Sequence, residues 1–327
     1  MKKTIALLMI GMMSLAACSA ADTPPVDDGN GAETPQEEPA ETPVETPADD
    51  VDNDEIDEEV LADFEAGIAE AEDPLEVKTS LDAIMETESE KTNDAALTAY
   101  LAYLRDFKQS GMTPYFDEMQ KLQPFFEEGT QNLSGDAITD ESLKDLYNRF
   151  TEMGYKFVQI EGSIEPVVDY RIIDGYSESV SDEMIDYGAF KSAESEQMWA
   201  ADAGIVISID ELGERIADGE AFLAKYPETV HKEDVILDLR NYLNGFFGGL
   251  DNTPAVLDNV YSEEFITAYE NFMDKHPDTK TAEVLTTYYD ELKAADFAAP
   301  YNINDPDSIR LFREQITYKV DEVVNGL

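Results

Sequence analysis

Apolar residues recur at helical spacing along most of the chain after about residue 60. The clearest run is predicted to be a helix capped by Asn93 and stopped by Gly111. Its apolar face consists of Leu97, Tyr100, Leu101, Leu104 and Phe107. The same pattern predicts three further helices, which open at Thr113-Pro114, Thr139 and Asp305-Pro306. We expect Phe116 to point inward in the first of these and Leu311 in the last, and Pro124 to kink or split the first.

Strand signals are few. Tyr155 to Ile160 and Gly204 to Ser208 are short apolar runs that fit either strands or buried helix ends. We therefore expect an all-α fold of antiparallel helix hairpins over residues 60–327, with a possible internal boundary near Gly154.

One segment recurs with an offset of 50 residues. Residues 216–229 and 266–279 share a Phe-x-x-Lys-x-Pro-acid-Thr pattern. The residue before proline avoids helical geometry, so a helix should end there, and Thr229 and Thr279 should cap the helices that follow. These units resemble the hairpins of tetratricopeptide-like bacterial lipoproteins, although the period is 50 and only two copies are visible. The alternative, which explains the pattern equally well, is that two unrelated helix-turn-helix corners acquired the same proline and capping residues independently.

The N-terminus has the features of an export signal. Lys2 and Lys3 precede an apolar run that is too short to span a membrane, and the run ends in Leu15-Ala16-Ala17-Cys18. This ending resembles the lipobox of bacterial lipoproteins. The resemblance implies that residues 1–17 are a signal peptide, and that Cys18 becomes the lipidated first residue, with diacylglyceryl and palmitate-type chains in the membrane. The alternative is an ordinary cleaved signal in which Cys18 is a chance residue.

Residues 18–59 read as a linker. From Ser19 to Glu59 the chain holds 16 acidic residues, six prolines and no lysine or arginine. Such a segment cannot bury enough apolar area to offset its chain entropy, so we expect it to be disordered and extended. It is interpreted as a spacer that holds the helical domain off the membrane, or else as filler without a selected length.

Charge narrows the possible partners. The 327 residues include 73 acidic and 22 basic side chains, for a formal charge of −51. This balance argues against nucleic acid as a partner, because phosphate binding needs clustered lysine and arginine. A single cysteine and two histidines leave no cofactor or metal motif, and we expect none. The acidity suits either solubility in harsh surroundings or the binding of cations or a basic protein.

The densest group of polar residues among apolar ones lies between residues 155 and 210. A candidate polar cluster contains Glu161, Asp169, Arg171, Glu194 and Asp202. Asp169 and Arg171 are expected to form an ion pair. Glu161 and Glu194 would need a separation of about 5–10 Å to act as an acid/base pair. The competing interpretation is structural, with carboxylates bonded to helix ends and Trp199 packed in the core.

The sequence therefore predicts a lipoprotein anchored on the extracytoplasmic face of the cell membrane through Cys18. Its helical domain, which between about residues 154 and 300 resembles uncharacterised exported proteins of Gram-positive bacteria, is interpreted as a non-enzymatic binding or scaffolding module for a protein or peptide. No catalytic residue is assigned. The alternative is a cell-envelope hydrolase that uses Glu161, Asp169 and Glu194.

Overall fold

Helices dominate the part of the chain that the structure, a computed structural model, describes: residues 55–71, 73–126, 133–302 and 305–327. The predicted signal peptide, Cys18 and nearly all of the predicted linker lie outside these residues. The α-helices are α1 (Glu58–Glu70), α2 (Pro74–Thr87), α3 (Glu90–Ser110), α4 (Phe116–Met119), α5 (Glu141–Glu152), α6 (Asp182–Glu196), α7 (Ile209–Lys225), α8 (Lys232–Gly248), α9 (Glu263–Lys275), α10 (Lys280–Ala294) and α11 (Pro306–Val324). The 3-10 helices are η1 (Thr113–Tyr115), η2 (Gln120–Phe125), η3 (Gly135–Ala137) and η4 (Tyr170–Tyr176).

The strands form short antiparallel hairpins that do not join into a larger sheet. The longest pairs β1 (Tyr155–Ile160) with β2 (Ser163–Val168), in the register Tyr155↔Val168. The others are β3 (Ala200–Ala201) with β4 (Gly204–Ile205), β5 (Gly249–Leu250) with β6 (Thr253–Pro254), and β7 (Val256–Leu257) with β8 (Val260–Tyr261). The sequence did not decide whether two short apolar runs are strands or helix ends. The run from Tyr155 to Ile160 is a strand throughout, and in the run from Gly204 to Ser208 only the two residues of β4 form a strand. The predicted all-α class holds, with hairpins as additions.

Short polar side chains mark most helix starts. Ser208 accepts a hydrogen bond from the N–H of Glu211 at 3.0 Å and so caps α7. The predicted cap at Asn93 is wrong: α3 begins earlier, with Ser89 as its N-cap. Asn93 is instead buried inside the helix, where its side-chain amide donates to the carbonyl of Ser179 at 2.7 Å. The tertiary partner decides its role.

Two positions expected in the core are on the surface. Phe116 is 47% exposed and Leu311 is 58% exposed. Around Pro124, which lacks the N–H that a continuous helix needs, the chain forms η1, α4 and η2 instead of one helix. The break at Pro124 was predicted. Without one continuous helix, the side chains of this segment do not share a single buried face, and Phe116 is exposed to solvent.

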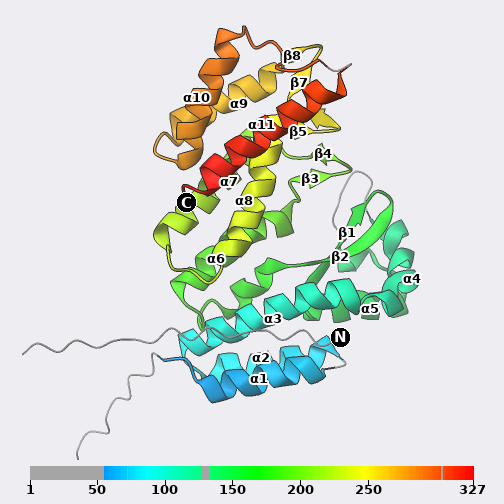
Figure 1. Cartoon of the computed structure of the whole chain (residues 1–327). Coiled ribbons are helices and arrows are strands. Elements are labelled where there is room, and N and C mark those ends of the chain that lie inside the picture. The colour runs from blue at the N-terminus through cyan, green and yellow to red at the C-terminus, as the bar shows by residue number, and fades with distance from the viewer. Residues whose placement is uncertain (1–54, 72, 127–132, 303–304) are drawn as a thin grey trace, which may run out of the picture. The chain divides into compact units, whose positions relative to one another are not determined.

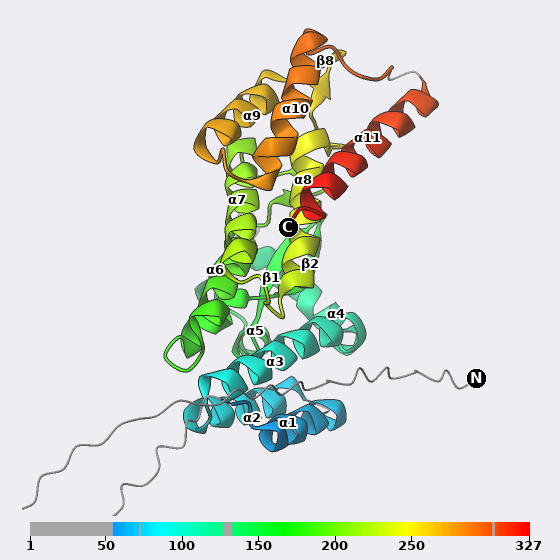
Figure 2. The ribbon, with the colours of Figure 1, turned by 60° about the vertical axis from the view of Figure 1, so that its left-hand side comes forward.

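The helical elements pack mostly on elements one to three places away in the chain (Figure 1). The α1–α2 hairpin lies against α3, and α3 also contacts β2. Helix α6 packs on η4, while α7 contacts α6, α8 and α9 (Figure 2). Helix α11 lies against α8 and α10. The described residues group into one compact unit.

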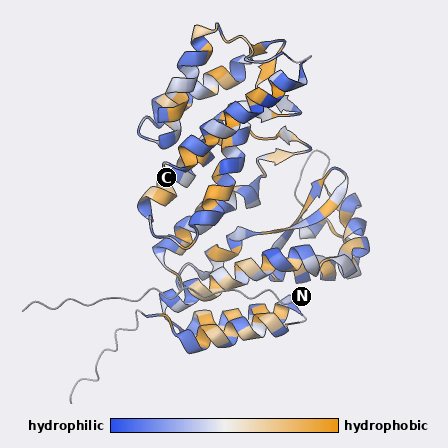
Figure 3. Ribbon diagram, viewed as in Figure 1, coloured by the Kyte–Doolittle hydropathy of each residue, from blue (hydrophilic) through white to orange (hydrophobic). Residues whose placement is uncertain are grey.

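One continuous apolar core runs through the described helices and is rich in buried aromatic residues. The helices alternate hydrophobic and hydrophilic residues along their length, as amphipathic helices do (Figure 3). Their apolar faces therefore meet one another inside, while most acidic side chains face out.

The repeated segments form the two expected hairpins, α7–α8 and α9–α10, and each first helix ends at the lysine two residues before proline. Thr279 caps α10 by accepting the N–H of Ala282 at 3.1 Å, as predicted. Thr229 does not cap α8: the N-cap is His231, which makes no side-chain cap bond. Thr229 instead accepts the N–H of His231 at 3.1 Å, in the turn before the helix. An extra turn between proline and α8 accounts for the difference.

Candidate functional site

The predicted pair of Asp169 and Arg171 is present at the start of η4. Asp169 caps this 3-10 helix by accepting the backbone N–H of Arg171 at 3.2 Å. Its carboxylate also binds the guanidinium of Arg171 through two bonds, of 2.8 and 2.5 Å. Because Arg171 is nearly half exposed, the pair organises a local turn and adds little to stability.

Glu194, near the end of α6, is fully engaged by its neighbours. Its carboxylate accepts hydrogen bonds from Arg215 of α7 at 2.8 Å and from the hydroxyl of Tyr242 of α8 at 2.9 Å. It also accepts the backbone N–H of Trp199 at 3.3 Å. The Trp199 ring packs edge-on against Tyr242, and a Cβ at Gly245 would lie only 2.4 Å from it. Glu194 and Trp199 therefore join three helices together.

The remaining two residues of the predicted cluster lie elsewhere. Glu161 and Asp202 occupy the turns of the β1–β2 and β3–β4 hairpins, each with a φ of 50°, and both are exposed. Asp169, Arg171 and Glu194 are all close enough to Lys156, near the other end of β1, for their charges to affect its pKa. Glu161 is five residues further along an extended chain, or about 16 Å away. The structure thus gathers Asp169, Arg171 and Glu194, and leaves Glu161 and Asp202 outside.

A second buried polar system, which sequence reasoning missed, lies between α6 and α8. Three side-chain pairs cross between these helices, and we call them the polar ladder: Tyr187–Asp234 at 2.7 Å, Lys191–Asp238, and Glu194–Tyr242 at 2.9 Å. The pairs rise in the same order along both helices, so α6 and α8 run in the same direction. A signal was present in the sequence, because polar residues recur at steps of three or four within apolar helices.

Helix α3 and η4 complete the ladder. Arg105 donates to Asp234 at 2.9 Å and to the hydroxyl of Tyr170 at 3.2 Å. The ammonium group of Lys191 lies 4.9 Å from the centre of the Tyr170 ring. Two cations, Arg105 and Lys191, therefore face two carboxylates, Asp234 and Asp238, at a partly buried junction, and these four charges balance.

Burial and pairing oppose each other in the ladder. Burial alone would raise the pKa of Asp234, but the hydroxyl of Tyr187 and the charges of Lys191 and Arg105 outweigh it and hold that pKa below its usual value. Burial would likewise lower the pKa of Lys191, yet Tyr170 and Asp238 keep it raised. The charged forms of Asp234 and Lys191 are therefore favoured, whereas at Asp238 burial outweighs the charge of Lys191 and raises the pKa of the carboxyl.

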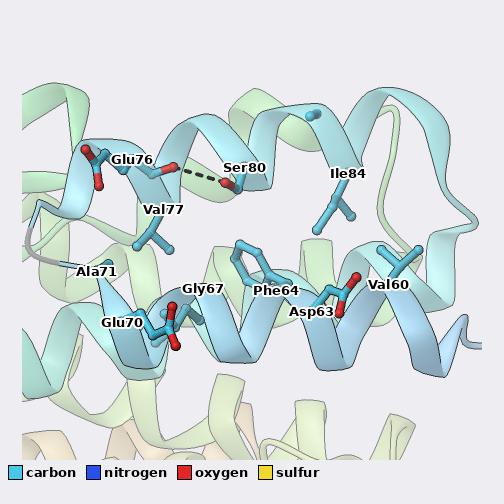
Figure 4. Close-up of a pocket in the computed structure, with 12 residues that line it drawn as sticks. Val60, Asp63, Phe64, Gly67, Glu70, Ala71, Glu76, Val77, Ser80 and Ile84 are labelled. Carbon is cyan, nitrogen blue, oxygen red and sulfur yellow. Dashed lines mark hydrogen bonds between the residues drawn. The ribbon is translucent and has the colours of Figure 1, made fainter.

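An open concave feature lies in the α1–α2 hairpin. A groove with a volume of about 610 Å³ runs between the two helices (Figure 4). Val60 and Phe64 point into it from α1, and Val77 and Ile84 point into it from α2. Phe64 is only 5% exposed, so its ring forms the floor and not a protruding contact. We call this feature the α1–α2 groove.

The rims of the α1–α2 groove are mostly polar and acidic, whereas its floor is apolar. Asp63, Gly67 and Glu70 line it on the α1 side at helical spacing, and Glu76 and Ser80 line it on the α2 side. The Ser80 hydroxyl donates to the carbonyl of Glu76 at 3.2 Å and so remains within its own helix. An apolar floor between acidic rims can bind an elongated apolar surface that carries positive charge.

Gly67 contributes an open position to this groove. A glycine inside a helix costs about 1 kcal/mol relative to alanine. A Cβ placed at Gly67 would meet nothing within 4 Å, so packing inside the protein does not require the glycine. Its absence of a side chain widens the groove at mid-length.

Comparisons with protein-family models, curated proteins and solved structures return no match for this chain. In the described ranges, no helix combines the length and the apolar character needed to cross a bilayer. Within the same ranges, no three His, Cys, Asp or Glu side chains are grouped so as to hold a metal ion.

Proposed function

We propose that this chain is a lipid-anchored extracytoplasmic lipoprotein, and that its helical region is a non-enzymatic binding module for a protein or peptide. The α1–α2 groove is the observation that supports the proposal most. It combines an apolar floor with solvent access, whereas the strongest buried polar groups are occupied by one another in the polar ladder. A binding surface and a rigid scaffold are then separate parts of one unit.

The membrane anchor is proposed from the sequence. Leu15-Ala16-Ala17-Cys18 follows an apolar run, and an acidic, proline-rich stretch separates it from α1. Two lipid chains on Cys18 would hold the protein firmly, because each buried CH₂ contributes about 0.8 kcal/mol. The groove lies in the first helical hairpin after this stretch.

The hydrolase alternative receives little support from these positions. Glu161 is exposed at the turn of the β1–β2 hairpin, with a φ of 50°, and so offers no enclosed carboxyl for acid/base work. Glu194 already accepts bonds from Arg215, Tyr242 and Trp199. A glycosidase-type acid would need a free carboxyl in a cleft.

Two measurements test the proposal. Cell fractionation of Cys18→Ser should move the protein from the membrane fraction to the soluble one, with loss of the lipid mass. Membrane retention with an unchanged mass would contradict the anchor.

The binding role is tested by cross-linking in envelope extract. We compare the parent chain with Gly67→Leu, which fills the groove, and with Ala69→Leu, which places the same side chain on an exposed position of α1 outside it. Partners should be lost only with Gly67→Leu. Identical partner sets for all three proteins would overturn the assignment of the groove.

A further inference from the structure

We infer that the α1–α2 groove takes a cationic amphipathic helix. This inference rests on the proposed binding function and adds the chemistry of the partner. The charge of the hairpin is its first support. Residues 58–87 contain ten acidic side chains and one lysine. That lysine, Lys78, is held by Asp82 at 2.6 Å and lies over the ring of Tyr176, so it does not line the groove.

The charge of the groove rims also favours a cationic ligand. Of the twelve described residues that line the groove, Asp63, Glu70 and Glu76 are acidic and none is basic. No ion pair is present at these three carboxylates within the described part of the chain. A ligand that brings lysine or arginine to these exposed rim carboxylates gains Coulomb attraction, and it is steered there by the field of the whole chain.

The spacing of the rim residues suggests a helical ligand. Asp63 and Glu70 are seven residues apart on α1, which places them about 10 Å apart along the axis at 1.5 Å per residue. Basic residues seven apart on a bound helix would match this separation. Between them, an apolar side chain of the ligand can enter above Phe64, where Gly67 leaves space. Helices that lay an apolar face into a groove use this i, i+4, i+7 spacing.

Like charge argues against two other occupants. Residues 19–59 hold 16 acidic and no basic side chains, so this segment of the same chain would be repelled by the rims. A second copy of the chain brings a formal charge of −51. The groove therefore favours a partner of opposite charge.

Designed peptides of about 18 residues, long enough for five helical turns, serve as probes. The first is an amphipathic helix with leucine on one face and lysine on the other. The second has glutamate in place of every lysine. The third keeps the lysines but replaces the leucines by serine. Binding is measured by calorimetry with the full chain in nanodiscs of zwitterionic lipid, against empty nanodiscs.

We expect the leucine–lysine peptide to bind one site, more weakly at higher salt, and the other two to bind at least about tenfold more weakly. Gly67→Leu, and the triple variant Asp63→Asn, Glu70→Gln, Glu76→Gln, should each raise the Kd by about tenfold or more, which corresponds to about 1.4 kcal/mol. Two control variants should leave the Kd of the leucine–lysine peptide nearly unchanged. These are Ala69→Leu and a matched triple variant at exposed acids elsewhere, Asp145→Asn, Glu152→Gln, Glu264→Gln.

The outcomes separate the two proposals. Binding that Gly67→Leu abolishes, but that the glutamate peptide shares, would overturn the cationic class and keep the groove as a binding site. Equal losses in both triple variants would show bulk charge attraction and overturn the inference. If no peptide binds in a Gly67-dependent way, the inference fails, and the cross-linking comparison in extract decides the broader binding role by itself.

Discussion

Glu220 of α7 and Thr281 of α10 are joined by a 2.9 Å hydrogen bond, from the backbone N–H of Thr281 to the carboxylate, across 61 residues of sequence. The other oxygen of Glu220 accepts the N–H of Lys280 at 2.6 Å. With Thr279 bound to the N–H of Ala282, the first three N–H groups of α10 are all satisfied. A carboxylate that is only 5% exposed thus caps a helix of the next hairpin and ties the two repeats together.

Removing that carboxylate should destabilise the fold. Glu220→Ala leaves two N–H groups at a buried helix start without their partner, so we expect a loss of about 2–4 kcal/mol in the free energy of unfolding. Urea unfolding measures it. Glu270 occupies the equivalent repeat position but is exposed and binds Tyr289. Glu270→Ala should cost clearly less, and equal costs would contradict the cross-repeat cap.

The two threonines of the repeat should differ from each other. Thr279→Ala removes a helix N-cap and should lower stability by about 0.5–2 kcal/mol, whereas Thr279→Ser should retain most of it. Thr229→Ala removes a turn bond before α8, for which we expect about 0.5–1.5 kcal/mol. Thermal melts decide. No shift in Thr279→Ala would argue against the observed cap.

The polar ladder should behave as a coupled pair at Lys191 and Asp238. Lys191→Met leaves a largely buried carboxylate without its cation and should cost about 3–5 kcal/mol. Adding Asp238→Leu should recover most of this loss, because the second charge is then absent. Denaturant unfolding of both variants tests it. Lys275→Met breaks an exposed pair with Glu214 and should change stability far less. A double variant as unstable as Lys191→Met would refute the pairing.

His231 should make the fold sensitive to mild acid. It is buried and stacked on Tyr187 at 3.8 Å, and burial lowers the pKa of its imidazole from 6.5 to about 4, although Glu183 and Asp234 act in the opposite direction. Between these two values the unfolded chain binds a proton that the folded chain does not. Stability is therefore complete above about pH 6.5 and falls as the pH drops toward 4, by about 2 kcal/mol between pH 7 and pH 5.

The control for this pH dependence is His231→Phe, which keeps an aromatic ring against Tyr187 and cannot titrate. The unfolding free energy of the parent minus that of the variant should decrease as the pH falls from 7 to 5, because only the parent loses stability through His231. A constant difference across that range would show that His231 does not carry the effect.

Local patterns were enough for much of the helical framework. Ser208 before an amphipathic run, Gly111 after one, and the proline corners near residues 227 and 277 act within a few residues, so their effect can be predicted without knowing the fold. The pair of Asp169 and Arg171 is of the same kind, because two residues in a tight turn are close in any fold that keeps the turn.

Contacts between distant segments could not be predicted in this way. Asn93 is of a residue type that commonly caps helices, but its side chain binds the carbonyl of Ser179, and Thr229 lies two residues before the N-cap of α8. Glu194 binds Arg215 and Tyr242 on two other helices, while Glu161 is exposed on a hairpin turn, and neither environment follows from local sequence.

By itself, the sequence determined the helical class, the corners of the two repeated hairpins and the acidic character, since each follows from spacing or composition. Only the tertiary structure decided which polar residues meet: the polar ladder, the Glu220 cap and the α1–α2 groove each combine side chains from separate helices. Their pairing depends on how helices are placed in three dimensions, and that placement is set by the packing of the whole core and not by any local signal.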